Sequence, residues 1–318
     1  MKIEELNVLE LFGGIGAIKK ALIRQKIPHK TLDYVEIDKN CVKSYNALYN
    51  TDFKPKSILD FHPPDKRIDL LMHGSPCQDF SRSGLKKGGE KGSGTRSSLL
   101  FETIRIIEEM KIRPKIVLWE NVKGVLDKNM RASFFHYLKE MERLGYENKY
   151  EILNAMDFGI PQKRERIFVV SILGENYFNF SSLEKIEAKD ISKFLEEDVS
   201  NLYEVKQESM LSHIRGDPKN NHFKGRLKVI DKFAYTISTK QVRIPNSGII
   251  DLGNGKYRYL TERECFRLMG FDDEDFNKLK AIYPGRKGKL LSILYKQAGN
   301  SIVVNVLEAI LKNIYHIK

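Results

Sequence analysis

The sequence predicts an α/β fold in which helices cover both faces of a mainly parallel β-sheet. In the first half of the chain, short apolar runs of strand length alternate with longer runs of helical periodicity. A glycine-rich turn joins the first predicted strand to the first predicted helix. Because 318 residues exceed what one core comfortably holds, a second, smaller lobe is expected.

The alternation predicts each element in turn. We expect strands near residues 6–12, 32–37, 68–73, 116–119, 150–154 and 166–172, and helices near residues 15–26, 39–49, 97–111 and 131–144. The acidic stretch 175–201 has a helical pattern. Thr261 with Glu264 three residues later is a capping sequence that begins another helix, and residues 303–314 form an amphipathic C-terminal helix.

Composition excludes several classes of protein. No apolar run approaches the roughly eighteen residues needed to span a bilayer, and residues 1–5 lack a signal-peptide pattern, so no membrane association is expected. Cys41, Cys77 and Cys265 are too few and too scattered for a disulfide framework or a zinc site. We therefore expect reduced thiols, no metal and a location in the cytosol.

The net charge of +12 favours a polyanionic partner. Residues 206–260 carry eleven Lys or Arg against four Asp or Glu, which accounts for +7 of that charge. A second basic stretch, residues 81–96, is rich in glycine. Such a loop suits a phosphate backbone, although a basic surface insertion without function has the same composition.

The glycine turn Gly13-Gly14-Ile15-Gly16 follows the predicted strand 6–12 directly. Glycines let a backbone approach a ligand closely, and the helix that follows offers free N–H groups. Many strand–helix junctions use glycine only to bend. Glu36 ends the next predicted strand about twenty residues later, where an acidic side chain can bind ribose hydroxyls. This spacing favours a nucleoside cofactor.

Three further features lie at the ends of predicted strands. Cys77 lies in the turn Gly74-Ser75-Pro76-Cys77-Gln78, where its thiol is either a small buried hydrophobe or a nucleophile. Glu120 closes the apolar run 116–119, at the sheet edge where doubly wound folds build sites. Arg164 and Arg166 alternate into another strand, so both guanidinium groups are expected on one face.

In this order, these motifs resemble those of the bacterial DNA (cytosine-5) methyltransferase family, of the kind found in type II restriction–modification systems. The resemblance covers nearly the whole chain except residues 171–259, where that family has its variable target-recognition region. The matching segments are Phe12–Gly16, Glu36, Asp60, Pro76–Gln78, Arg96–Phe101, Glu120–Val122, Gln162–Arg166, Arg263–Phe271 and Gln297–Ser301.

The resemblance implies a Rossmann-like sheet of the S-adenosylmethionine-dependent methyltransferase type. It also implies a discontinuous catalytic domain at 1–172 plus 261–318 and a target-recognition domain at 173–260. The expected cofactor is S-adenosyl-L-methionine, with S-adenosyl-L-homocysteine as product. The resemblance implies double-stranded DNA as the partner, bound by a monomer at the nucleoid in the bacterial cytosol, and a cognate restriction endonuclease as a functional companion.

Roles for single residues also follow from the resemblance. Cys77 would add to C6 of a flipped cytosine, Glu120 would stabilise charge at N3, Arg166 would hold O2, and Arg164 would orient Glu120 or the thiolate. The cofactor would contact Phe12, Gly14, Ile15, Gly16, Glu36, Ile37, Asp60, Phe61, Pro76, Leu99, Asn300 and Ser301. DNA contacts are expected from Ser81, Arg82, Ser83, Lys86, Lys87, Arg96, Thr236, Gln241 and Arg243.

A tRNA (cytosine-5) methyltransferase on the same core is the alternative. Members of that branch usually carry a Cys-Phe-Thr tripeptide in the recognition region, and the only Cys-Phe pair here, Cys265-Phe266, is followed by Arg267 in a helix common to both branches. A DNA-binding relative without activity would lack Cys77 or Glu120, and both are present. The DNA sequence that is recognised does not follow from these residues.

Overall fold

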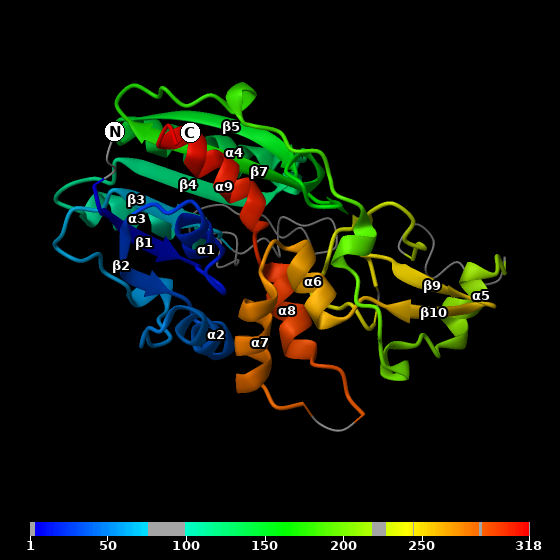
Figure 1. The fold of residues 1–318 in the computed structure, drawn as a ribbon. Helices are drawn as coiled ribbons and strands as arrows, with labels where there is room; N and C mark the ends of the chain where they lie inside the picture. The colour runs from blue at the N-terminus through cyan, green and yellow to red at the C-terminus, as the bar shows by residue number, and fades with distance from the viewer. Residues whose placement is uncertain (1–3, 76–98, 218–226, 244, 286–287, 318) are drawn as a thin grey trace.

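The computed structural model describes residues 4–75, 99–217, 227–243, 245–285 and 288–317. Its centre is a six-stranded sheet of strand order β2-β1-β3-β4-β7-β5 (Figure 1). Neighbouring strands among the first four are parallel, and β7 runs antiparallel to both β4 and β5. The predicted α/β fold with a mainly parallel sheet is confirmed. The strands are β1 (Leu6–Leu11), β2 (His29–Val35), β3 (Leu70–His73), β4 (Ile116–Val122), β5 (Tyr146–Asn154) and β7 (Glu165–Leu173).

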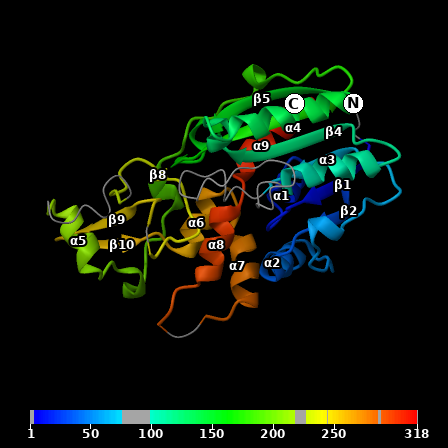
Figure 2. The same cartoon turned by 180° about the vertical axis from the view of Figure 1, so that it is seen from behind.

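Alternation of side chains along the strands divides the core into two layers. Val8, Leu70 and Leu118 point to one face of the sheet, where α1 (Ala17–Arg24) and α9 (Val304–Ile314) cover them. The next residue on each strand points to the other face, which α3 (Leu100–Glu109) and α4 (Arg131–Arg143) cover. The two opposite views show these helix pairs on opposite sides of the sheet (Figures 1 and 2). Strands buried on both faces explain the nearly continuous apolar runs in the sequence.

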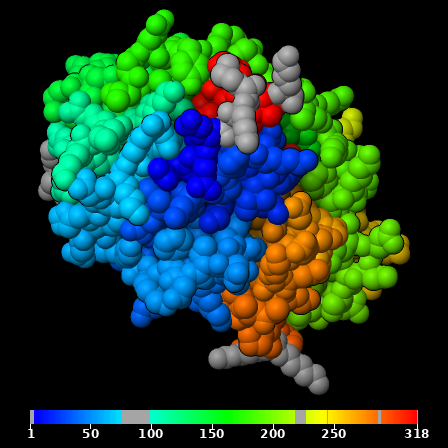
Figure 3. All heavy atoms as spheres, turned by 60° about the vertical axis from the view of Figure 1, so that its left-hand side comes forward, coloured from blue at the N-terminus to red at the C-terminus, as the bar shows by residue number. Residues whose placement is uncertain are grey.

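The C-terminal segment returns to the sheet through three helices before α9. They are α6 (Glu262–Leu268), α7 (Asp273–Ile282) and α8 (Ser292–Asn300). Thr261 caps α6, and its side chain and that of Glu264 each bind the other's backbone, so the predicted capping box is confirmed. α7 lies against α2 (Lys39–Tyr49), where Lys43 donates to the carbonyl of Ile282 (Figure 3).

Residues 204–260 contain a smaller cluster of their own. The hairpin of β9 (Ile249–Gly253) and β10 (Lys256–Tyr259) lies beside α5 (Glu208–Ile214) at the end of the molecule away from β2 (Figure 1). Val205, Met210, Leu227, Ile249 and Tyr259 form its apolar centre. The short strands β6 (Gln162–Lys163) and β8 (Ala234–Tyr235) pair in parallel and connect this region to the sheet.

The helical pattern expected for residues 175–201 is wrong. Three single 3₁₀ turns occur in and just after this stretch, at Phe180–Ser182, Ile191–Phe194 and Asn201–Tyr203. Each begins at a residue whose side chain accepts a hydrogen bond from the backbone two positions on, namely Asn179, Asp190 and Ser200. Such local bonds compete with a continuous helix. Phe178, Leu183 and Ile191, which lie in or beside these turns, instead enter the core.

The boundaries of two strands differ from expectation in a way that affects the site. β2 begins at His29 and ends at Val35, so Glu36 follows the strand directly. β4 continues to Val122, so Glu120 lies inside the strand. Over the described ranges, no helix combines the length and apolarity that crossing a bilayer requires.

Candidate active site at the carboxyl ends of the strands

The glycine turn after β1 is held from behind by tyrosines of β2 and α2. A Cβ atom on Gly13 would come within 2.6 Å of the Tyr34 ring, and one on Gly16 within 2.5 Å of the Tyr49 ring. Tyr34 Oη donates to the carbonyl of Gly14 (2.5 Å), and Tyr49 Oη donates to that of Gly16 (2.6 Å). Gly14 faces open space. Two glycines are therefore required by packing, and Gly14 leaves room on the cavity side.

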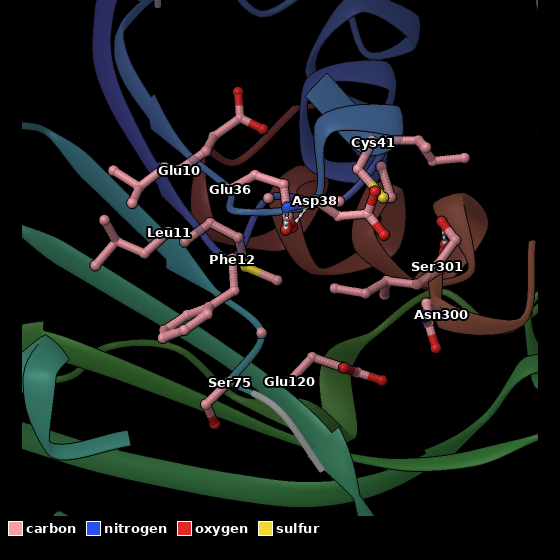
Figure 4. Close-up of a pocket in the computed structure, with 18 of the residues that line it drawn as sticks. Glu10, Leu11, Phe12, Glu36, Asp38, Cys41, Ser75, Glu120, Asn300 and Ser301 are labelled. Carbon is pink, nitrogen blue, oxygen red and sulfur yellow. Dashed lines mark hydrogen bonds between the residues drawn. The ribbon is translucent and has the colours of Figure 1, made fainter. Parts of the chain in front are cut away.

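Glu36 braces the same turn from the end of β2. Its carboxylate accepts hydrogen bonds from the backbone N–H of Gly14 (3.1 Å) and of Asp38 (2.8 Å). Burial raises the pKa of Glu36, and these hydrogen bonds act against that rise. The carboxylate stands at the wall of a cavity, where it can accept hydrogen bonds from a ligand's hydroxyl groups (Figure 4).

This cavity has a volume of about 410 Å³ and lies at the carboxyl ends of β1, β2, β3 and β4. A volume in the range of about 300–1,000 Å³ suits a small-molecule ligand. Figure 4 shows side chains from separate segments around it, with Glu36 and Asp38 from one side and Asn300 and Ser301 from another. The predicted site residues that line it are Phe12, Gly14, Ile15, Glu36, Ile37, Leu99, Glu120, Arg164, Arg166, Asn300 and Ser301.

Other predicted cofactor residues lie differently. Gly16 stands behind the cavity wall, against Tyr45 and Tyr49. Asp60 is exposed and Phe61 is buried among core residues, and neither is among the lining residues. Leu59, which sequence reasoning missed, lines the cavity instead and is 60% exposed. Ile37, which also lines it, is 71% exposed. Two exposed apolar side chains at one cavity suit the faces of an aromatic ring.

Glu120 projects from β4 into the cavity wall. The antiparallel pairing of β4 with β7 sets Val122 opposite Arg166, and Arg166 Nε lies 3.2 Å from Glu120 Oε1. Burial raises the pKa of Glu120, while the positive charges of Arg166 and, less strongly, Arg164 act against the rise. A buried carboxyl of raised pKa beside a guanidinium can donate a proton to a bound group.

Arg164 lies between β6 and β7 and is buried. Its Nη1 donates to the carbonyl of Ile237 (2.9 Å), and its Nη2 donates to the carbonyls of Gly299 (3.1 Å) and Ser301 (2.8 Å). The sequence placed Arg164 on the same face as Arg166, and both residues line the cavity. Its guanidinium nevertheless donates to backbone carbonyls, one at Ile237 and two at the C-terminal end of α8.

Ser75, which follows β3, is hydrogen-bonded to side chains of β4, the strand that contains Glu120. Its hydroxyl oxygen accepts hydrogen bonds from Trp119 Nε1 and Asn121 Nδ2, both at 3.2 Å. Sequence reasoning missed this link because it depends on side chains that meet only in the folded sheet. The next residues, which include Pro76, Cys77, Ser81, Arg82, Ser83, Lys86, Lys87 and Arg96, lie outside the described part of the chain.

The three remaining DNA-contact predictions fall in described segments. Thr236 Oγ1 donates to the carbonyl of Lys163 (2.9 Å). Gln241 is buried and its Oε1 accepts from Ser247 Oγ (2.7 Å), so in this structure its side chain is turned inward. Arg243 is exposed. In the described ranges, no group of three or more His, Cys, Asp or Glu side chains is arranged to hold a metal ion.

Comparisons with known proteins match nearly the whole chain to one family. The family model of C-5 cytosine-specific DNA methylases matches residues 6–316. The type II methyltransferase M2.ScrFI of Lactococcus lactis subsp. cremoris is 33% identical, over 98% of this chain and 99% of its own length. The type II methyltransferase M.Bsp6I of Bacillus sp. (strain RFL6) is 32% identical, over 98% of each chain.

Solved structures show the same fold at lower identity. The Schizosaccharomyces pombe Dnmt2 methyltransferase superposes with a TM-score of 0.77 over 98% of this chain and 99% of that chain, at 21% identity. A putative DNA modification methyltransferase encoded within an Escherichia coli prophage gives a TM-score of 0.68 at 18% identity, over 98% of this chain and 99% of that chain. These likenesses concern the fold alone.

Proposed function

Because this chain belongs to the C-5 cytosine-specific DNA methylase family and methylates cytosine in DNA at C5, we propose that its active site is built on the carboxyl ends of β1–β4. In this proposal Cys77 is the nucleophile, Glu120 is the acid and Arg166 binds the base. The observation that carries it is the buried Glu120 with Arg166 at 3.2 Å, on the wall of the cavity that also contains the glycine turn.

The nucleophile is needed because C5 of cytosine is itself a poor nucleophile. Addition of a thiolate at C6 breaks the aromaticity of the ring and moves electron density toward N3 and C5. A thiolate is strongly nucleophilic near neutral pH and is a good leaving group afterwards. Cys77 follows β3 by four residues, so the chain enters the nucleophile's turn from the strand next to that of Glu120.

Glu120 handles the charge that develops on the ring. When protonated, its carboxyl donates to N3 as Cys77 adds to C6, and burial favours that protonated form. Arg166 donates to O2 of the base and holds the carboxyl in place. After the methyl group is on C5, the C5 proton leaves to solvent and the Cys77 thiolate is expelled, which restores the aromatic ring.

The residues that line the cavity fit S-adenosylmethionine. Gly14 has open space where a Cβ would stand, the Glu36 carboxylate can accept from ribose hydroxyls, and Ile37 and Leu59 offer apolar surface for an adenine. When bound, this cofactor supplies an electrophilic methyl group on a sulfonium sulfur. The lining of Phe12, Leu99, Asn300 and Ser301 would hold the rest of the molecule and exclude water.

We assign DNA recognition to a target-recognition domain, residues 173–260, whose fold is held by the apolar cluster and the β9–β10 hairpin. Residues 1–172 and 261–318 form the catalytic domain. The +7 charge of residues 206–260 supports this division. The target base has to leave the duplex, at a cost of a few kcal/mol. Ser83 and the exposed Arg243 remain candidates for filling the gap that it leaves.

The type II names of M2.ScrFI and M.Bsp6I favour a role in restriction–modification, with a cognate endonuclease as functional companion. A monomer acting on the nucleoid in the bacterial cytosol fits this role. The tRNA alternative has less support, because the Dnmt2 likeness is one of fold at 21% identity.

The decisive experiment is bisulfite sequencing of DNA from cells that express the protein, followed by a tritiated-methyl assay on the motif it reveals. We expect 5-methylcytosine in one short sequence context, loss of transfer in Cys77→Ser with cofactor binding retained, and a covalent adduct with a 5-fluorocytosine duplex. Methylation of tRNA in place of DNA, or full activity of Cys77→Ser, would contradict the proposal.

A further inference from the structure

Residues 234–239, here called the recognition strap, are bound to the sheet along their length. β8 pairs with β6, the backbone N–H of Ala234 donates to the carbonyl of Pro161 (2.8 Å), and that of Ile237 donates to Gln162 Oε1 (3.0 Å). The strap leads directly into Gln241 and Arg243. It is therefore a firm connection between the segment proposed to contact DNA and the body of the enzyme.

The same strap touches the wall of the cofactor cavity on its other side. A Cβ atom on Gly299 would lie 2.5 Å from the carbonyl carbon of Ser238 and 2.6 Å from the N atom of Thr239. Backbone therefore rests on backbone here, which only glycine permits. Asn300 and Ser301, the next two residues, line the cavity.

Arg164 bridges these two walls with one side chain. Its guanidinium binds the strap at the carbonyl of Ile237 and binds the cavity wall at the carbonyls of Gly299 and Ser301. The group is planar and rigid, so movement of one set of carbonyls is transmitted to the other. Because the guanidinium is buried, breaking these hydrogen bonds leaves its donors unpaired, which is costly.

We propose that Arg164 is a positioning residue that couples the recognition strap to the cofactor wall, so that duplex and cofactor each strengthen the binding of the other. The proposal rests on the function given above, and it goes further by assigning the coupling to one side chain. Such coupling is reciprocal and is commonly worth about 5- to 150-fold in affinity. With this coupling, the enzyme binds the duplex with the highest affinity when the cofactor is bound.

The test is the affinity of S-adenosylhomocysteine with and without a duplex that contains the motif found by bisulfite sequencing. Isothermal titration gives the ratio of the two dissociation constants. We expect a ratio of about 5 or more in the wild-type protein. In Arg164→Lys, which retains the charge but cannot reach three carbonyls with one fork, the ratio should fall to less than half of the wild-type value.

A matched control separates coupling from general loosening. Gln162→Met removes two hydrogen bonds: the one that the Gln162 side chain accepts from the Ile237 N–H and the one that it donates to the Leu268 carbonyl. The hydrogen bonds of Arg164 remain. It should lower the melting temperature and keep the ratio. Gly299→Ala leaves Arg164 unchanged and separates strap and wall, so it should lower the ratio even if Arg164→Lys fails to fold.

The inference is overturned if the wild-type ratio is close to 1, if Arg164→Lys keeps the wild-type ratio, or if Gln162→Met loses it equally. These outcomes differ from failure of the proposed function. If the proposed function itself were wrong, the wild-type protein would leave C5 of cytosine in DNA unmodified, whatever the ratio of the two dissociation constants.

Discussion

The burial of Glu120 and the positive charge beside it suit the acid role that we propose for this residue. Burial of its carboxyl raises its pKa, and the positive charge of Arg166 offsets part of that rise. The result is a carboxyl that can be protonated when a neutral base occupies the cavity and that is held in one orientation. Both properties come from the pairing of β4 with β7.

Glu120→Gln should lower the single-turnover rate of methyl transfer by about 10²-fold or more, the usual size of a lost general acid. An amide cannot give a proton to N3. Since the acid form is needed, the wild-type rate should fall as pH rises through the pKa of Glu120, and this dependence should be absent in the variant. Rapid-quench measurement with tritiated cofactor across pH 6–9 tests both points.

Glu165→Gln is the control for that experiment. Glu165 is the neighbour of Arg166 on β7 and pairs with Lys123 at the surface. Its substitution should leave both the rate and its pH dependence within a factor of about two, because a surface ion pair contributes little. An unchanged rate in Glu120→Gln would remove this residue from the chemistry.

Glu10 predicts a pH dependence of stability. It is fully buried on β1, Tyr45 Oη donates to its Oε1 (2.5 Å), and burial raises its pKa from 4.5 to about 7. The folded protein therefore binds a proton more tightly than the unfolded chain does, so stability is lost as pH rises from about 4.5 to 7. Since one pKa unit corresponds to about 1.4 kcal/mol, the loss due to Glu10 is about 3 kcal/mol.

Glu10→Gln should remove that part of the decline. Urea unfolding at pH 5, 6, 7 and 8 measures it, with the exposed Glu175→Gln as the control that keeps the wild-type decline. If the free energy of unfolding fell equally with pH in the wild-type protein and in Glu10→Gln, ionisation of the Glu10 carboxyl would not destabilise the fold, which contradicts the prediction.

At this scale the sequence predicted the cavity side chains that lie at strand ends better than those of the short 3₁₀ turn. Glu36 and Glu120 were predicted from their positions at strand ends, and both line the cavity. Asp60 and Phe61 were expected beside them, but the short 3₁₀ helix Ile58–Asp60 turns Leu59 to the cavity. Which side of such a turn faces inward depends on the packing of Phe61 in the core, and no periodicity in the sequence reveals it.

Among the elements, the glycine turn shows that one motif can contain two kinds of glycine. Gly16 has φ 79° and no room for a Cβ, whereas Gly14 has φ 55° and open space around it. The first is therefore constrained by packing against α2. The second is constrained by its backbone conformation and by the ligand that the open space would admit.

Substitution by alanine should separate the two. Gly16→Ala forces the tyrosines away and should lower the free energy of unfolding by more than the roughly 1–2 kcal/mol that a left-handed conformation costs an alanine. Gly14→Ala should cost about that amount only, yet weaken S-adenosylhomocysteine binding at least 10-fold. Urea unfolding and calorimetric titration of both variants measure the difference. Equal losses in both assays would contradict this division.

Most elements could be predicted because their apolar residues have a clear period. All six strands of the main sheet were expected, as were α1–α4 and α9, within a few residues at their ends. Residues 175–201 could not be predicted in this way. Their core contacts are single side chains such as Phe178 and Leu183, separated by local caps, and such a pattern resembles a helix only by composition.

At the scale of the whole molecule, the positive charge predicts a strong salt dependence of DNA binding. The logarithm of the association constant should fall linearly with the logarithm of salt concentration, with a slope of about −0.9 for each phosphate contacted. If the exposed Arg243 binds a phosphate, Arg243→Gln should reduce the slope by about 1 and weaken binding equally for all sequences. Fluorescence anisotropy between 50 and 300 mM KCl measures this.

Lys111→Gln is the matched control, because Lys111 follows α3 at the sheet edge opposite the site and is exposed. Its slope should equal that of the wild-type protein. Loss of binding to one sequence only, with an unchanged slope, would instead make Arg243 a reader of bases.

The packing of α1 against α9 has a consequence for how the enzyme is made. Ala21 and Leu22 share one core with Leu307 and Ile310, and Arg24 pairs with Glu308 at 2.9 Å. Contacts between residues so distant in the chain close late in folding. A nascent polypeptide whose residues 304–314 are still in the ribosome leaves exposed the part of α1 that α9 covers, where chaperones and proteases can bind.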